Sequence, residues 1–145
     1  MSRFFFLTLI MLLPLPSSGG DYVVLLHGIA KDSSCMHHFE SFLSKEGFEV
    51  INLDYPSADH RIEVLAARVR AAIAGEITDP ERTVHLVGYS LGSQVLRLLL
   101  RDHRPEQLGR VVFLAPPNQG SEVADFLHDT TFYWAYFGPA GHQLG

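Results

Sequence analysis

The chain has 145 residues, of which 47% are hydrophobic, 19% charged and 11% aromatic, the profile of one ordinary globular domain with a targeting segment. Sixteen acidic against eleven basic side chains leave a formal charge of −5 with no long run of one sign. This composition excludes disorder, collagen and coiled coil, and it carries no electrostatic footprint for nucleic acid. The single cysteine, Cys35, cannot form an internal disulfide, and the eight histidines show no metal-ligand spacing. We therefore expect a fold that rests on packing, with no metal, no cofactor and no nucleic-acid partner.

Residues 1–20 have the order of a secretory signal peptide, in which a basic residue precedes an apolar run at 4–13 and then prolines and small residues. A membrane-spanning helix needs about 20 apolar residues, and this run is shorter. We therefore expect an exported protein, periplasmic or secreted, with cleavage between Ser17 and Asp21. An uncleaved signal that anchors the protein in a membrane is the alternative. Residues 21–145 are enough for one modest core.

The chain after residue 20 alternates apolar runs with amphipathic segments. Residues 22–26 are a continuous apolar run, which is typical of a strand covered on both faces by helices. Apolar residues at helical spacing follow at 36–43, after N-cap residues at 31–34, and Gly47 is placed to end this helix. Residues 48–53 predict the second strand.

A second helix is predicted by apolar residues that share one face between Ile62 and Ile73, with Gly75 as its stop. Beyond it we expect strands at residues 84–87 and 110–114 and helices at residues 91–101 and 121–128. Alternation of this kind predicts right-handed crossovers and an α/β fold with a doubly wound, mostly parallel sheet.

The sharpest local pattern is Gly88-Tyr89-Ser90-Leu91-Gly92, at the junction of the third strand with its helix, the context of a nucleophile elbow. Ser90 would occupy a strained backbone position in this turn, while Gly88 and Gly92 leave no side chain to block close packing of strand and helix. Glycine and serine are common, so the context carries the prediction more than the pattern does. The alternative is that Ser90 is an ordinary helix N-cap.

A serine nucleophile needs hydrogen-bond donors for the oxyanion that develops on the attacked carbonyl. The candidates are two backbone N–H groups, that of Leu91 directly after Ser90 and that of Ile29 after the first strand. Ligands of open α/β sheets bind beyond the carboxyl ends of the strands, where both candidates and the loop at 116–121 fall. His27 is expected to have a structural role and is not our general base.

In these segments the sequence resembles the α/β-hydrolases, in particular their bacterial lipase-like and esterase-like members. The resemblance covers most of the chain after residue 20 and keeps the family's order and spacing. It is carried by LHGIA at 26–30, VINLDYPS at 50–57, VGYSLG at 87–92, LAPPNQGS at 114–121 and GPAGHQLG at 138–145. It implies Ser90 as the nucleophile, Ile29 and Leu91 as oxyanion-hole positions, and hydrolysis of small-molecule or lipid carboxylic esters through an acyl-enzyme.

The sequence departs from the family after the nucleophile, where the resemblance implies an acidic residue and then a histidine on later strands. Asp125 with His128 or His142 is a compact substitute, but Asp125 and His128 lie three apart on one predicted helix. We therefore expect an α/β-hydrolase fold that is incomplete at the C-terminus, with the acid and base of the triad unidentified.

Two rival functions stay open at this point. One is a catalytically inactive fragment or binding module of the same fold, and the other is an acyltransferase in which an alcohol or amine takes the acyl group. The aromatic cluster at 132–137 is compatible with an acyl-binding entrance or with uncovered core. Association of the protein with a membrane surface also stays open. Asp54 is expected to cap a turn and Cys35 to be partly buried. The oligomeric state stays open.

Overall fold

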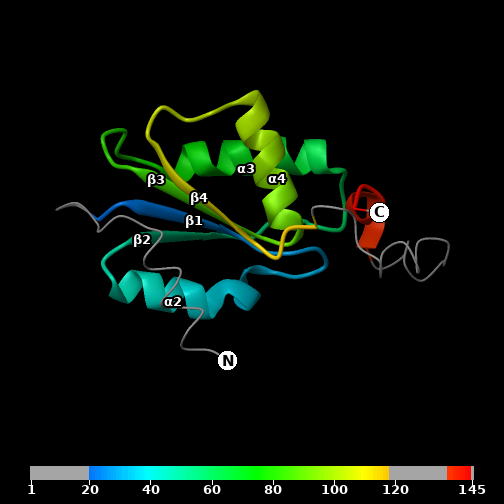
Figure 1. The fold of residues 1–145 in the computed structure, drawn as a ribbon, viewed down its shortest axis with the longest axis horizontal. Helices are drawn as coiled ribbons and strands as arrows, with labels where there is room; N and C mark the ends of the chain where they lie inside the picture. The colour runs from blue at the N-terminus through cyan, green and yellow to red at the C-terminus, as the bar shows by residue number, and fades with distance from the viewer. Residues whose placement is uncertain (1–19, 118–136, 145) are drawn as a thin grey trace.

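The computed structural model describes residues 20–117 and 137–144. Within them, four parallel strands form one sheet in the order β2-β1-β3-β4. The elements in chain order are β1 (Tyr22–Leu26), the 3-10 helix η1 (Ser33–Met36), α2 (His37–Lys45), β2 (Glu49–Leu53), α3 (Ile62–Glu76), β3 (Val84–Tyr89), α4 (Leu91–Asp102) and β4 (Leu108–Leu114). The α2 helix covers one face of the sheet, and α3 and α4 cover the other (Figure 1). The predicted doubly wound parallel sheet is thereby confirmed.

The central strand β1 explains why the sheet needs helices on both faces. All five of its residues are fully buried, as its continuous apolar run predicts. Alternate side chains face opposite ways: Val24 lies in a cluster with residues of α3 and α4, whereas Val23 and Leu25 pack with Leu43 of α2. The two halves of the core therefore meet at β1.

Two glycines behave differently at the ends of helices. Gly47 follows α2 with a φ of 92°, the left-handed conformation that commonly ends a helix. Gly75, in contrast, lies inside α3, which continues to Glu76, so the predicted stop at Gly75 is wrong. Apart from its chain neighbours and the backbone of its own helix, no described heavy atom lies within 4 Å of the Cβ position of Gly75, and the Ile77 N–H, two residues on, still donates to the Ile73 carbonyl at 3.0 Å.

Several expectations concern residues outside the core. Cys35 is exposed, which corrects the expected partial burial, since the 3-10 helix turns only Met36 inward. The predicted signal peptide up to residue 19, the predicted helix at 121–128 and residues 132–136 of the aromatic cluster lie outside the described residues. Among the residues that are described, no helix is long and apolar enough to cross a membrane.

Candidate functional site

Ser90 connects β3 to α4 in a strained conformation. Its φ of 51° and ψ of −116° are rarely adopted by residues other than glycine. Its N–H donates to the Leu114 carbonyl at the end of β4, and its carbonyl accepts the Ser93 N–H in the first turn of α4, both at 2.9 Å. The Ser90 side chain makes no capping hydrogen bond to α4, unlike an N-cap serine. Backbone hydrogen bonds therefore stabilise the strained conformation of Ser90, and the Ser90 hydroxyl does not cap α4.

Gly88 and Gly92 allow the backbones around Ser90 to approach closely. A Cβ atom on Gly88 would lie 2.7 Å from the Gly92 carbonyl group, and one on Gly92 would lie 2.6 Å from the Leu26 carbonyl oxygen. The Ser93 hydroxyl donates to the Gly88 carbonyl at 2.8 Å and ties the end of β3 to α4. Strand β3, helix α4 and the end of β1 thus meet at distances that any Cβ would prevent.

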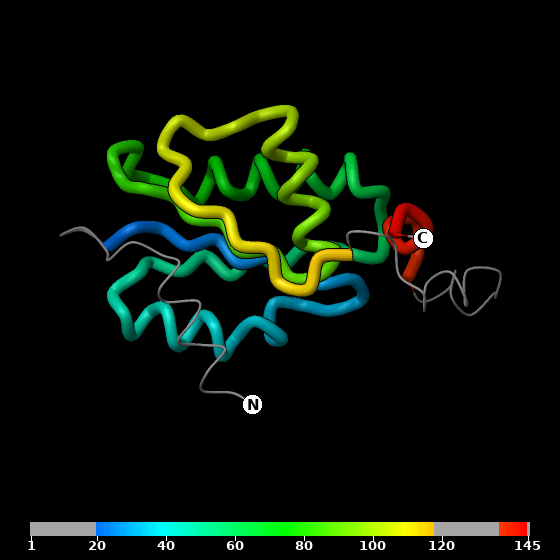
Figure 2. The backbone as a smooth tube through the Cα atoms, in the orientation of Figure 1, coloured from blue at the N-terminus to red at the C-terminus, as the bar shows by residue number. Residues whose placement is uncertain are grey.

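The loop after β1 lies directly beside Ser90. A Cβ built on Gly28 would be 3.4 Å from the Ser90 Cβ and 3.2 Å from the ring of Tyr89. In Figure 2 this loop and the junction of β3 with α4 lie at the same end of the sheet. The structure therefore brings Ile29, the residue after Gly28, to the same end of the sheet as Ser90 and Leu91, at the carboxyl ends of β1 and β3.

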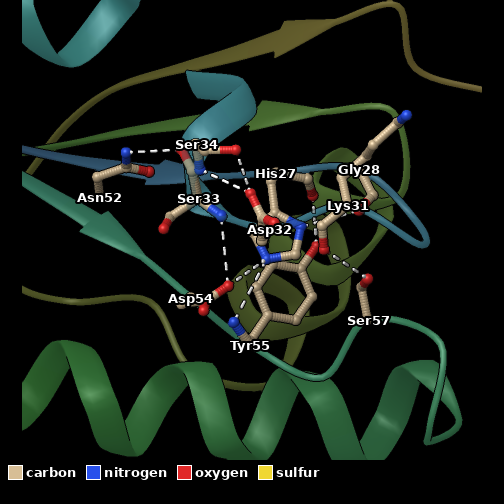
Figure 3. Close-up of polar contacts among 10 residues, drawn as sticks. All are labelled: His27, Gly28, Lys31, Asp32, Ser33, Ser34, Asn52, Asp54, Tyr55 and Ser57. Carbon is tan, nitrogen blue, oxygen red and sulfur yellow. Dashed lines mark hydrogen bonds and ion pairs between the residues drawn. The ribbon is translucent and has the colours of Figure 1, made fainter. Parts of the chain in front are cut away.

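His27 is buried beneath this loop and has a partner at each ring nitrogen (Figure 3). Its Nδ1 lies 2.9 Å from the Gly28 carbonyl oxygen, and its Nε2 lies 3.3 Å from the Tyr55 amide nitrogen. Its ring stacks on the Tyr55 ring with centroids 4.2 Å apart. Asp54 Oδ1 accepts the Ser33 N–H at 3.3 Å and lies equally far from His27 Nε2. Both side chains thus hold the loop, as expected of a structural histidine and a capping aspartate.

Sequence reasoning did not single out Tyr55. Its side chain is only 7% exposed, and its hydroxyl donates to the His27 carbonyl at 2.5 Å. Burial raises the pKa of this phenol above its usual range, so the hydroxyl stays protonated and remains a donor. The signal needs the strand order: once the first and second predicted strands are known to pair in parallel, the residues just after them lie at the same edge of the sheet.

The candidate acid and base are only partly within the described residues. Asp125 and His128 lie outside them. His142 lies within them, and its neighbour Gln143 accepts the Ile62 N–H at 2.6 Å, which docks this segment against the start of α3. Between the described residues, no hydrogen bond joins the Ser90 hydroxyl to a histidine or a carboxylate, and no three potential ligand side chains converge on a metal position.

Open cavities lie elsewhere in the described part of the molecule. One of about 510 Å³ is lined by residues at the C-terminal ends of α3 and α4, among them Ile73, Leu99 and His103. Its walls contain none of Ile29, Ser90 and Leu91. The backbone geometry at Ser90 therefore locates the candidate site more specifically than cavity volume does.

A family model and solved structures resemble the chain over most of its length. The model of the Alpha/beta hydrolase family matches residues 23–144, whereas no curated protein matches the chain. The solved structure of lipase BlEst2 from Bacillus licheniformis, in its mature form, is 24% identical with a TM-score of 0.64, over 91% of this chain and 57% of that one. An extracellular alpha/beta-hydrolase from a Paenibacillus species is 24% identical with a TM-score of 0.58, over 72% of this chain and 45% of that one.

Phospholipase PlaB from Legionella pneumophila is 19% identical with a TM-score of 0.65, over 85% of this chain and 32% of that one. The chain thus spans 57% of the length of the Bacillus lipase and less of the other two. Likeness at these identities shows a shared fold, and it confirms the expected α/β-hydrolase architecture. With the sheet order and the strained serine turn described above, the match over residues 23–144 establishes that the chain belongs to the alpha/beta hydrolase family.

Proposed function

We propose that the protein is a serine hydrolase of carboxylic esters, with Ser90 as nucleophile and the N–H groups of Leu91 and Ile29 as oxyanion donors. The observation that carries the proposal is the conformation of Ser90, with φ 51° and ψ −116° and a hydroxyl that does not cap its helix. Strained residues persist where their surroundings hold them, and they cluster at active sites. The Leu91 N–H also lies at the positive end of α4, which favours a developing negative charge.

The proposed reaction has two steps. Ser90 Oγ attacks the ester carbonyl carbon and gives its proton to a general base, and the alcohol departs with that proton when the carbon–oxygen bond breaks. Water then attacks the acyl-enzyme, again with proton transfer through the base, and releases the carboxylic acid while Ser90 regains its proton. We assign no residue to the base or to its acidic partner.

The expected substrates are small-molecule or lipid esters. Structural neighbours include a lipase and a phospholipase by name, which supports ester substrates in general. The extracellular neighbour and the signal-like residues 1–20 support export, which we also propose. Residues 21–145 would then form the N-terminal portion of the hydrolase domain of the exported protein.

The test compares wild type with Ser90→Ala in the full-length natural protein, with hydrolysis of a short p-nitrophenyl ester and labelling by a fluorophosphonate probe as readouts. The variant should lose about 10⁴-fold or more of turnover, the scale seen when a triad nucleophile is removed, and it should lose labelling. The matched control is Ser44→Ala, which removes an exposed serine of α2 and should change neither readout. Undiminished hydrolysis by Ser90→Ala would reject the proposal. Added alcohol acceptors with product analysis would reveal an acyltransferase.

A further inference from the structure

We infer that Tyr55 is a positioning residue that acts through His27 to direct the Ile29 N–H as an oxyanion donor. This inference rests on the function proposed for Ile29. Figure 3 shows the arrangement: Tyr55, just after β2, lies beside the His27 ring, and His27 in turn contacts Gly28. Neither His27 nor Tyr55 needs to touch substrate for this role.

The first step is the tautomer of His27. A carbonyl oxygen only accepts hydrogen bonds, so the 2.9 Å contact with the Gly28 oxygen requires the proton on Nδ1. In the neutral ring Nε2 is then an acceptor, and the Tyr55 backbone N–H, 3.3 Å away, supplies its donor. The Tyr55 amide therefore selects the tautomer that can hold the Gly28 carbonyl.

The second step follows from the planarity of the peptide bond. The Gly28 carbonyl and the Ile29 N–H belong to one planar trans peptide, so they point in opposite directions. Because His27 holds the oxygen, the Ile29 N–H is directed away from the buried ring. The same loop approaches the elbow at Gly28, whose Cβ position is 3.4 Å from the Ser90 Cβ. One side-chain hydrogen bond thus fixes the orientation of the proposed donor.

The third step is the preceding peptide, which the Tyr55 side chain holds. The Tyr55 hydroxyl donates to the His27 carbonyl at 2.5 Å, and the two rings stack at an angle of 25°. Gly92 of α4 approaches the same carbonyl, since a Cβ there would be 2.9 Å from the His27 oxygen. The His27 carbonyl is therefore held by Tyr55 and lies close against α4, which leaves the loop little freedom to rotate.

Asp54 offers a competing partner for His27, with Oδ1 3.3 Å from Nε2. Its side chain is 68% exposed, so water solvates the carboxylate without help from the ring. If Nε2 carried a proton for Asp54 while Nδ1 kept its own, the buried Tyr55 N–H would lose its acceptor. The neutral ring with the proton on Nδ1 satisfies Gly28 and Tyr55 together.

The test of this inference uses kinetics in the full-length natural protein. Tyr55→Phe keeps the stacked ring and removes the hydroxyl, and we expect kcat for a short ester to fall about tenfold, because removal of a whole oxyanion donor costs about 10²–10³-fold. KM should stay within about twofold, since the donor acts in the transition state. The matched control is Ser57→Ala, which removes another buried hydroxyl that reaches this loop, at the Lys31 carbonyl, and should leave kcat within about twofold of wild type.

A second pair of variants separates positioning from stability. The side-chain amide of His27→Asn can still donate to the Gly28 carbonyl, whereas His27→Leu cannot, so we expect the asparagine variant to retain several-fold more kcat at equal thermal stability. The ¹⁵N shifts of the His27 ring should show a proton on Nδ1 and none on Nε2 in the wild type.

If Tyr55→Phe keeps the full kcat while Ser90→Ala loses activity, this inference is overturned and the proposed function stands. A proton on Nε2 of the His27 ring would have the same consequence. If Ser90→Ala hydrolyses esters as fast as wild type, the proposed function fails and the inference fails with it.

Discussion

Replacing Gly92 by alanine tests whether the close packing around Ser90 governs both stability and activity. The added methyl would lie 2.6 Å from the Leu26 carbonyl oxygen and 2.9 Å from the His27 carbonyl oxygen, and both are backbone atoms of a fully buried region. Reaching an ordinary contact of 3.4 Å from 2.6 Å requires a movement of 0.8 Å. Overpacking of this kind costs about 1–3 kcal/mol, which exceeds the gain of up to about 1 kcal/mol in helix propensity. We expect Gly92→Ala to lose about 1–2 kcal/mol in free energy of unfolding.

The matched control for this substitution is Gly75→Ala in α3, where no described atom beyond the backbone of the helix itself lies within 4 Å of the Cβ position. Alanine should there raise the free energy of unfolding by about 0.5–1 kcal/mol. Urea unfolding followed by circular dichroism measures both changes, which should have opposite signs. Ester hydrolysis should fall at least about tenfold in Gly92→Ala alone, because misplacement by about 1 Å can cost 100-fold. Equal stabilisation by the two alanines, with full activity, would refute the packing argument.

Three further predictions concern other parts of the chain. Ser93→Ala removes the buried donor to the Gly88 carbonyl and should cost about 1–2 kcal/mol in urea unfolding; an unchanged midpoint would contradict this. Burial lowers the pKa of His85 in the folded protein, although the nearby Asp21 carboxylate favours the charged ring. As pH falls below about 6.5, His85 therefore binds a proton in the unfolded chain before it does so in the folded protein. The free energy of unfolding should decrease from there toward the folded pKa. The side-chain oxygen of His85→Asn can accept the Arg110 N–H that His85 Nδ1 accepts. In this variant the decrease in free energy of unfolding at low pH should be smaller. Residues 1–20 have the order of a signal peptide, so mass spectrometry of the exported protein should find a new N-terminus between Ser17 and Tyr22. An intact Met1 on membrane-bound protein would contradict export by cleavage.

Local sequence patterns were sufficient to predict most of the framework. The apolar run of β1 predicts burial on both faces because each of its side chains must lie on one face or the other. The glycines around Ser90 and the position of the motif between strand and helix likewise predict a tight junction. The stop at Gly75 was wrong because glycine adopts helical as readily as left-handed backbone, and nothing local to that residue decides between them.

The contribution of Tyr55 could not be predicted from a local pattern, because it depends on which strands become neighbours. β1 pairs with β2 in a register that places Leu26 beside Leu53, and this pairing alone brings His27 next to Asp54 and Tyr55. Nothing in the separate segments shows that contact until the sheet order is known. The helices and strands could therefore be predicted from the sequence, whereas the contacts that hold the loop of the candidate site could be found only once the strand order was known.

The sheet order also explains why these groups gather where they do. In the order β2-β1-β3-β4, the chain leaves β1 toward β2 on one side and leaves β3 toward β4 on the other, so the two loops diverge at the carboxyl ends of neighbouring strands. Such a switch point is where open α/β sheets bind ligands. Ile29 follows β1, Leu91 follows β3, and Tyr55, which follows β2, supports the loop after β1. If the proposed donors act together, a change at Tyr55, just after β2, must alter the rate of a reaction that takes place between β1 and β3, without Tyr55 having to touch the ester.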